Sequence, residues 1–224
     1  MNMSKKKNFI IIFKLFFFVI YSNLYSNDKH NELLNLLEYN YPAEFFFTQA
    51  SKDSLSEGWM IIGGKGKARI EFTPPNNTLI IADGKWIIFH DPELDRATYL
   101  PLESGILQAL LDPQSYQNKK SFLVRETKED GKIVFNIEFN LEEKKQEVFI
   151  YFSEKNFTLL GWKIIESANK EIIVKISEIK KVTKEQLLKK NIFKFTEKMR
   201  KTGKAYYGPY KRKVNRIENN GRLN

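Results

Sequence analysis

The second half of the sequence alternates apolar and polar residues in segments separated by short turns. The segment "KIVFNIEFN" (132–140) places Ile133, Phe135, Ile137 and Phe139 on one side, which is the two-residue period of a half-buried strand. "QEVFIYFS", "LLGWKIIES" and "EIIVKISEI" follow, separated by the turn-rich "EKN" and "ANKE". Because no helix fits between them, these segments predict an antiparallel meander. Several strands are apolar on both faces, as expected of a curved sheet that encloses other parts of the protein or a ligand.

A hairpin is predicted in the segment "TLIIADGKWIIFHDP" (78–92). Asp83-Gly84 is a favoured two-residue turn, so the pattern places Ile81 opposite Trp86 and Leu79 opposite Ile88. The face that carries Trp86 is predicted to be the more buried one.

The upstream segment "GGKGKARIEF" (63–72) resembles a phosphate-binding loop but lacks its spacing, since Ala68 follows Gly66-Lys67. It predicts a turn that leads into a strand.

Two short helices accompany the strands. "HNELLNLLEYNY" places Leu33, Leu34, Leu37 and Tyr41 on one helical stripe that ends near Pro42. "GILQALLDP" (105–113) predicts a second apolar helix. Beyond Phe195 the periodicity stops, and residues 197–224 form a basic extension that we expect to be mobile.

The N-terminus has the layout of a secretory signal peptide. Lys5, Lys6 and Lys7 precede an apolar run from Phe9 to Tyr21, and small polar residues follow. We expect residues 1–26 to direct export, with a retained N-terminal anchor as the alternative. Loss of residues 1–26 removes four lysines and no acid, so the net charge falls from +10 to +6. The chain has no cysteine, which excludes disulfides, thiolate chemistry and a lipid-modified cysteine.

Catalytic and metal-binding patterns are weak. The chain has two histidines, and His90 with Asp91, Glu93 and Asp95 lies in a turn where Asp and Pro are common anyway. Ser167-Ala168-Asn169-Lys170 and Lys201-Thr202-Gly203 match two short motifs of penicillin-binding enzymes, but the Ser-Asp-Asn element is missing and Ser167 falls in a turn. The sequence therefore predicts a protein that is not an enzyme and needs no cofactor or metal.

The region "GWMIIGGKGKARIEFTPPNNTLIIADGKWIIFHDPELDRATYLPL" resembles the hallmark region of the LolA family, the outer-membrane lipoprotein carrier proteins. The "LLGW" segment around Trp162 and Gln49 after the Phe45–Phe47 run agree with it. The matching residues are Gly66, Arg69, Glu71, Phe72, Pro74, Pro75, Asp83, Gly84, Lys85, Asp91 and Pro92.

The resemblance implies an α+β fold: an unclosed antiparallel β-barrel whose open side is covered by short helices, here over residues 27–196. It implies a monomeric periplasmic carrier that takes acylated lipoproteins from an inner-membrane ABC transporter to an outer-membrane receptor, with no role for nucleic acid. A lipoprotein sensor or receptor on the same fold is the alternative. A second alternative function is binding of anionic membranes through the basic tail.

The resemblance also implies an acyl-binding cavity between sheet and helices. The residues expected to line it are Leu33, Leu37, Phe46, Ala68, Ile70, Phe72, Ile81, Trp86, Ile88, Leu107, Leu110, Phe135, Ile137 and Trp162. In the family an arginine before Pro-Gly bonds the backbone of the lid and holds the empty cavity shut, whereas this chain has Gly64 there, followed by Lys65. Lys65 and Arg69 are therefore the expected polar residues of the lid.

Overall fold

The computed structural model of the protein describes residues 28–91, 93–104, 107–116, 122–141, 144–167, 170–189 and 191–196. The predicted signal peptide (1–26) and basic tail (197–224) lie outside these residues.

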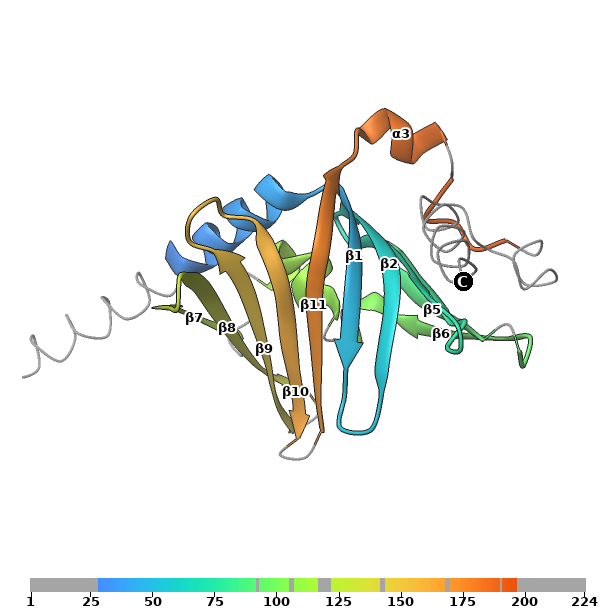
Figure 1. Cartoon of the computed structure of the whole chain (residues 1–224), viewed down its shortest axis with the longest axis horizontal. Helices are drawn as coiled ribbons and strands as arrows, with labels where there is room; N and C mark the ends of the chain where they lie inside the picture. Colours follow the sequence, from blue (N-terminus) through green and yellow to red (C-terminus); the bar gives the residue numbers. More distant parts are fainter. Residues whose placement is uncertain are drawn as a thin grey trace, which may run out of the picture.

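One antiparallel sheet of eleven strands forms the protein (Figure 1). The strand order is β6-β5-β4-β3-β2-β1-β11-β10-β9-β8-β7. Every strand except β6 therefore neighbours the next in sequence, and the first and last strands pair in the middle. The strands are β1 (Ala43–Ala50), β2 (Leu55–Gly64), β3 (Lys67–Phe72), β4 (Leu79–Asp83), β5 (Trp86–Asp91), β6 (Arg96–Pro101), β7 (Phe122–Glu129), β8 (Lys132–Leu141), β9 (Lys144–Ser153), β10 (Leu159–Ser167) and β11 (Lys170–Lys181).

The sheet is not closed, because β6 and β7 are its two edges and do not pair with each other. The chain passes from one edge to the other through η1 (Leu102–Ser104), α2 (Leu107–Leu111) and η2 (Pro113–Tyr116). This architecture confirms the predicted unclosed antiparallel barrel with short helices.

The sheet face that packs against the helices, called the inner face below, is continuously apolar. Alternation along the strands brings residues from β1 to β5 and from β7 to β11 into one buried cluster. Its largest members include Phe45, Phe47, Phe135, Phe152 and Trp162, each less than 5% exposed. The sheet therefore builds the core by wrapping this face around the helices.

An N-terminal helix over residues 28–40 covers the inner face. Leu33 and Leu37, one helical turn apart, are buried in the core cluster. The helix ends at Asn40, whose side-chain amide donates to the carbonyls of Leu36 (2.8 Å) and Phe157 (2.9 Å). Its Oδ1 accepts from the N–H of Leu159 (2.9 Å). One buried amide thus closes the helix and fastens it to the β9–β10 turn.

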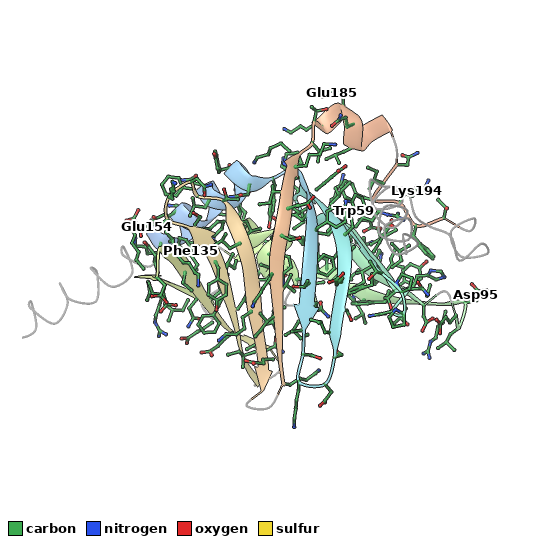
Figure 2. The ribbon with its side chains drawn as sticks, viewed as in Figure 1. Trp59, Asp95, Phe135, Glu154, Glu185 and Lys194 are labelled. Carbon is green, nitrogen blue, oxygen red and sulfur yellow. The ribbon has the colours of Figure 1, made fainter. Side chains whose placement is uncertain are left out.

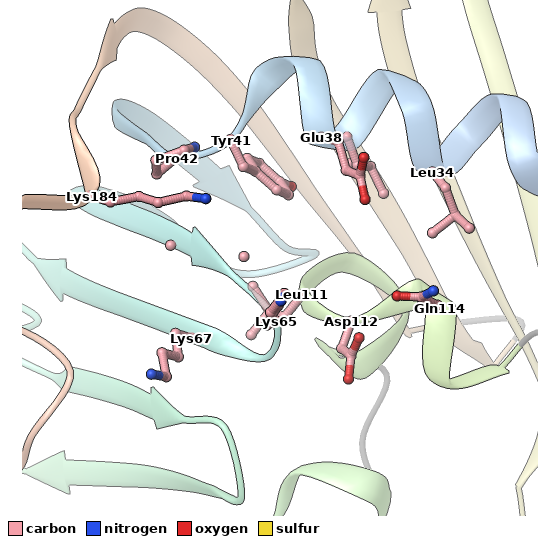
Figure 3. A pocket seen from close by; sticks show the side chains of 13 residues that line it. Leu34, Glu38, Tyr41, Pro42, Lys65, Lys67, Leu111, Asp112, Gln114 and Lys184 are labelled. Atoms are coloured by element: carbon pink, nitrogen blue, oxygen red, sulfur yellow. The ribbon is translucent and has the colours of Figure 1, made fainter.

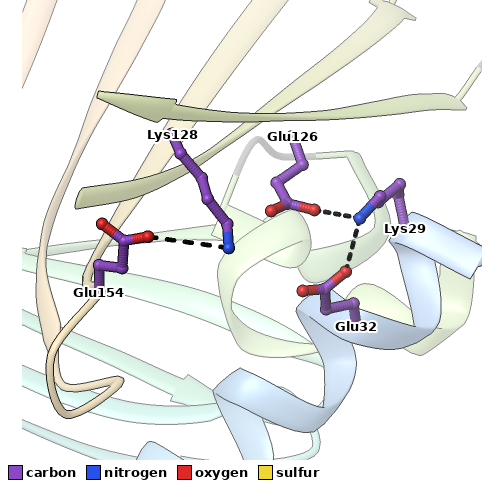
Figure 4. A network of polar contacts seen from close by, with 5 residues as sticks. All are labelled: Lys29, Glu32, Glu126, Lys128 and Glu154. Carbon is purple, nitrogen blue, oxygen red and sulfur yellow. Dashed lines mark hydrogen bonds and ion pairs between the residues drawn. The ribbon is translucent and has the colours of Figure 1, made fainter. Parts of the chain in front are cut away.

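The other end of this helix is held by charge (Figure 4). Lys29 Nζ donates to Glu32 at 2.8 Å on its own helix and to Glu126 on β7. These bonds, that to Glu126 first, raise the pKa of Lys29 well above its usual value. Beside this group Lys128 and Glu154 form a longer ion pair of 3.8 Å between β7 and the β9–β10 turn.

The opposite, outer face of β2 to β5 is covered by the C-terminal part of the described chain. After β11 the chain forms α3 (Lys184–Lys189) and then residues 191–196, named the strap here. Trp59 and Ile61 pack with Leu187 and Ile192, and Leu79 and Ile81 pack with Phe195. In Figure 2 Trp59 lies on the side of Lys194, away from Phe135. The second apolar face of these strands therefore belongs to a second layer.

The β4–β5 hairpin forms, but one residue later than predicted. Asp83 is the last residue of β4 and its Oδ1 accepts from the N–H groups of Lys85 and Trp86, both at 2.8 Å. The loop is therefore Gly84-Lys85, and Ile81 lies opposite Ile88 rather than Trp86. The predicted set of residues on one face is correct. That face is the outer one, whereas Ala82 and Ile87 face the core cluster.

Candidate functional site

A pocket of about 600 Å³ opens at the rim between the sheet and its helices (Figure 3). Its walls come from the N-terminal helix, the β2–β3 turn, the end of α2, η2 and α3. The lining residues are Leu34, Leu37, Glu38, Tyr41, Pro42, Gly63, Gly64, Lys65, Lys67, Leu111, Asp112, Gln114 and Lys184. The aliphatic and ring carbons form an apolar surface, and six of the thirteen residues carry charged or amide side chains.

Backbone hydrogen bonds attach the α2 side of this pocket to the sheet. The N–H of Gly66, in the β2–β3 turn, donates to the carbonyl of Leu111 at 2.9 Å. The N–H of Leu102 donates to the carbonyl of Lys85, also at 2.9 Å. Gly66 has φ +73°, and a Cβ there would lie 2.6 Å from Leu102 Cδ2. Only glycine therefore suits this contact without displacement of the Leu102 side chain.

The pocket perturbs two titratable groups. Burial raises the pKa of the Tyr41 phenol, and its hydroxyl has no hydrogen-bond partner among the described residues. Burial also raises the pKa of Asp112, while the positive charge of Lys65 acts in the opposite direction. The rim thus combines a buried hydroxyl with carboxylates and ammonium groups around an apolar surface.

Ten of the predicted cavity residues lie on the inner side of the sheet. Eight are buried in the core cluster and two, Ile70 and Leu107, are half-buried against it. The eight are Leu33, Leu37, Ala68, Phe72, Leu110, Phe135, Ile137 and Trp162. They pack against one another, and of the ten only Leu37 also lines the pocket. Their binding to acyl chains stays a prediction.

The other four lie on the outer side. Phe46 packs with the cluster around Trp59, and Ile81 packs with Leu79. Ile88 lines a separate outer pocket of about 480 Å³ beside the strap, and Trp86 shares its face by strand alternation. The expectation that these four point toward the helices is wrong, because alternation sends them the other way.

Lys65 lines the pocket, and its role at the lid stays a prediction, whereas Arg69 lies on the outer side. Its Nε lies 2.5 Å from Glu71 Oε1, and its Nη1 donates to the carbonyl of Ile192 in the strap at 3.2 Å. Arg69 therefore holds the strap rather than the lid.

Sequence reasoning missed most of the pocket. Leu34, Leu37, Glu38 and Tyr41 share one helix face by their i, i+3, i+4 and i+7 spacing, so this wall could have been found. Asp112 and Lys184 come together with it only through the tertiary fold.

The described residues contain no group of three or more His, Asp or Glu side chains placed to bind a metal ion. Among them no helix is both long enough and apolar enough to cross a membrane. An open antiparallel sheet with helices packed into its apolar face, and a pocket at the rim, is the architecture of a binding or carrier protein.

The profile of the family described as "Outer membrane lipoprotein carrier protein LolA" matches residues 43–196. The chain belongs to this LolA family. A search of curated proteins found no sequence that matches this chain.

Three solved structures illustrate the structural similarity. LolA superfamily protein NE2245 from Nitrosomonas europaea is 12% identical, with 70% of this chain and 97% of that chain covered and a TM-score of 0.38. The MucA/MucB complex of Pseudomonas aeruginosa is 11% identical, with 71% of this chain and 60% of that chain covered and a TM-score of 0.40. Lipoprotein LppX of Mycobacterium tuberculosis is 8% identical, with 68% of this chain and 94% of that chain covered and a TM-score of 0.36.

Proposed function

We propose that this protein carries acylated lipoproteins across the periplasm, with their acyl chains held between the inner face of the sheet and its helices. The observation that carries the proposal is the continuous apolar inner face, which is covered by two short helical elements and opens at a rim pocket. Membership of the LolA family supports it. No catalytic group takes part, since binding and release alone move the client.

The energy of acyl burial explains why a carrier is needed. Each buried CH₂ contributes about 0.8 kcal/mol, so a chain of about fourteen carbons contributes on the order of 11 kcal/mol. Because the inner face is now packed by the protein's own side chains, an acyl chain enters only if the N-terminal helix or α2 moves outward. The pocket at the rim is the proposed entrance.

The N-terminal helix and the α2 segment, which together form the proposed lid, are attached to the sheet by different kinds of hydrogen bond. The N-terminal helix is tied to the sheet at Lys29 and Asn40 by side chains, whereas the α2 segment is tied to sheet turns by the backbone bonds of Gly66 and Leu102. We propose that the Gly66–Leu111 bond replaces the lid arginine that this chain lacks at Gly64.

Competition between an apolar fluorescent probe and an acylated peptide tests the carrier function. We expect the acylated peptide to displace the probe, while the same peptide without its acyl chain does not. Leu34→Glu places a charge in the half-buried pocket wall and should weaken displacement. Leu94→Glu, at a site 70% exposed and outside the pocket, should not. Equal displacement by both peptides would refute the proposal.

We further propose that residues 1–26 export the protein to the periplasm and that the ABC transporter and outer-membrane receptor of the family are its partners. Cell fractionation of the full chain and of a form lacking residues 1–26 tests export. Recovery of both forms in the same compartment would contradict it.

A further inference from the structure

The rim pocket has two walls of opposite charge. Glu38 on the N-terminal helix and Asp112 after α2 supply carboxylates on one side. Lys67 in β3 and Lys184 at the start of α3 supply ammonium groups on the other, whereas Lys65 in the β2–β3 turn lies beside Asp112 (Figure 3). Figure 3 shows Lys184 reaching in from the α3 side and Glu38 pointing down from the helix on the opposite side. The separation of Glu38 from Lys67 and Lys184 follows from the fold, since Glu38 is on the N-terminal helix and the two lysines are on β3 and α3.

Neither Lys184 nor Glu38 makes an ion pair with another described residue. Two lysines do act on neighbouring carboxylates: Lys65 opposes the rise in the pKa of Asp112, and Lys184 adds to the hydrogen bonds that lower the pKa of Glu185. Within the described part of the chain, the pocket thus offers the carboxylate of Glu38 and the ammonium groups of Lys67 and Lys184, none of which forms an ion pair. They lie on either side of an apolar surface formed by Leu34, Leu37 and Leu111.

Tyr41 adds a neutral polar group between the two walls (Figure 3). Its hydroxyl is buried and has no hydrogen-bond partner among the described residues. Since buried polar groups are nearly always hydrogen-bonded, this hydroxyl is suited to a ligand oxygen that reaches the back of the pocket.

We propose that the rim pocket recognises an amphiphile whose headgroup carries both a phosphate and an ammonium group, as in phosphoethanolamine lipids. The phosphate lies toward Lys184 and Lys67, the ammonium toward Glu38, and the acyl chain runs along the apolar wall toward the inner face. This inference rests on the proposed acyl-binding function and adds a headgroup specificity to it. A purely anionic headgroup would leave Glu38 facing negative charge, and a neutral headgroup would use neither wall.

Three single-chain lipids with the same acyl chain separate these alternatives. Lysophosphatidylethanolamine, lysophosphatidic acid and monoacylglycerol each compete with an apolar fluorescent probe for the full chain at low ionic strength. We expect the zwitterionic lipid to displace the probe at about one tenth of the concentration that monoacylglycerol needs, since tenfold is about what two partly exposed charge pairs supply. Lysophosphatidic acid should fall between them.

Charge-removing variants locate the effect. Lys184→Ala and Glu38→Gln should each weaken binding of the zwitterionic lipid about three- to fivefold and leave monoacylglycerol unchanged. Lys155→Ala and Glu93→Gln, exposed and outside the pocket, are the matched controls and should change neither.

The outcomes distinguish this inference from the proposed function. If no lipid displaces the probe, acyl binding itself fails. If all three displace it equally, or if lysophosphatidic acid binds most tightly, acyl binding holds and the zwitterion specificity is overturned. Equal effects of Lys184→Ala and Lys155→Ala would also overturn it, because the charge would then act without a defined position.

Discussion

Arg69 and Glu71 form a buried ion pair on the outer face of β3, with Nε and Oε1 separated by 2.5 Å and the side chains 0% and 1% exposed. The strap closes over this pair, since Arg69 Nη1 also donates to the carbonyl of Ile192. The two residues alternate with Ala68, Ile70 and Phe72, which face the core. One short strand thus contributes one face to the core cluster and the other to the contact with the C-terminal segment.

Glu71→Gln should lower the free energy of unfolding by about 3–5 kcal/mol, because it leaves the Arg69 charge buried without its carboxylate. Replacing both residues by Met should cost much less, since no buried charge then remains. Denaturant titration measures both. Glu138→Gln breaks the more exposed pair with Arg125 and should cost less than about 1 kcal/mol. A Glu71→Gln cost as small as this control would show that the strap does not depend on the pair.

Gly66→Ala should destabilise the protein more than Gly131→Ala. Both glycines have positive φ, +73° and +70°, but a Cβ at Gly66 meets Leu102 at 2.6 Å while one at Gly131 meets nothing within 4 Å. The control therefore carries only the left-handed backbone cost, about 1–2 kcal/mol. The difference between the two variants reports the turn–lid contact, and thermal unfolding measures it.

The Gly66 variant should also change access to the pocket. Displacing the turn lengthens its hydrogen bond to Leu111, so Gly66→Ala should bind an apolar probe faster than the unaltered protein, whereas Gly131→Ala should not. Unchanged binding kinetics in Gly66→Ala would contradict the proposal that the Gly66–Leu111 hydrogen bond holds the pocket closed.

The sheet and both inner helices were predictable because their signals are local. Period-two alternation defines β8 to β11, and the i, i+3, i+4 stripe defines the N-terminal helix. The register of the β4–β5 hairpin was not predictable from "ADGK" alone, because Asp83 ends the strand by accepting hydrogen bonds from the loop. A one-residue difference in turn position changes every cross-strand pair.

The outer layer was missed for a different reason. Strands apolar on both faces, such as β2 around Trp59 and Ile61, show that something covers each face but not which segment does so. The covering residues Leu187, Ile192 and Phe195 follow no regular period. For the same reason Phe46, Ile81, Trp86 and Ile88 were assigned to the wrong side.

Tyr41→Phe should raise the free energy of unfolding of the ligand-free protein by about 1 kcal/mol, since it removes a buried hydroxyl that lacks a hydrogen-bond partner among the described residues. The ring contact with Phe45, edge-on at 6.2 Å between centroids, is retained. Tyr99→Phe, at a site 52% exposed, is the control and should change stability little. A destabilised Tyr41→Phe protein would mean that the hydroxyl is already satisfied.

His30 should make the N-terminal helix sensitive to acid. It lies one helical turn before Leu33 on the buried face, only 4% exposed, and burial lowers its pKa below the usual 6.5. The unfolded chain therefore takes up a proton at a higher pH than the folded protein does. The stability that His30 contributes is complete above about pH 6.5 and is lost as the pH falls toward its folded pKa.

Hydrogen exchange of residues 28–40, followed from about pH 8 to about pH 5 and corrected for intrinsic rates, measures this dependence. We expect protection of the helix to fall over the acidic part of the range before protection of β8 to β10 does, because the helix is held to the sheet by few contacts besides its apolar face. His30→Leu places a side chain that cannot titrate at this buried position, so it should abolish the early loss of helix protection. Equal acid sensitivity of the two proteins would assign the effect to carboxylates such as Glu126, whose bonds to Lys29 hold the same helix.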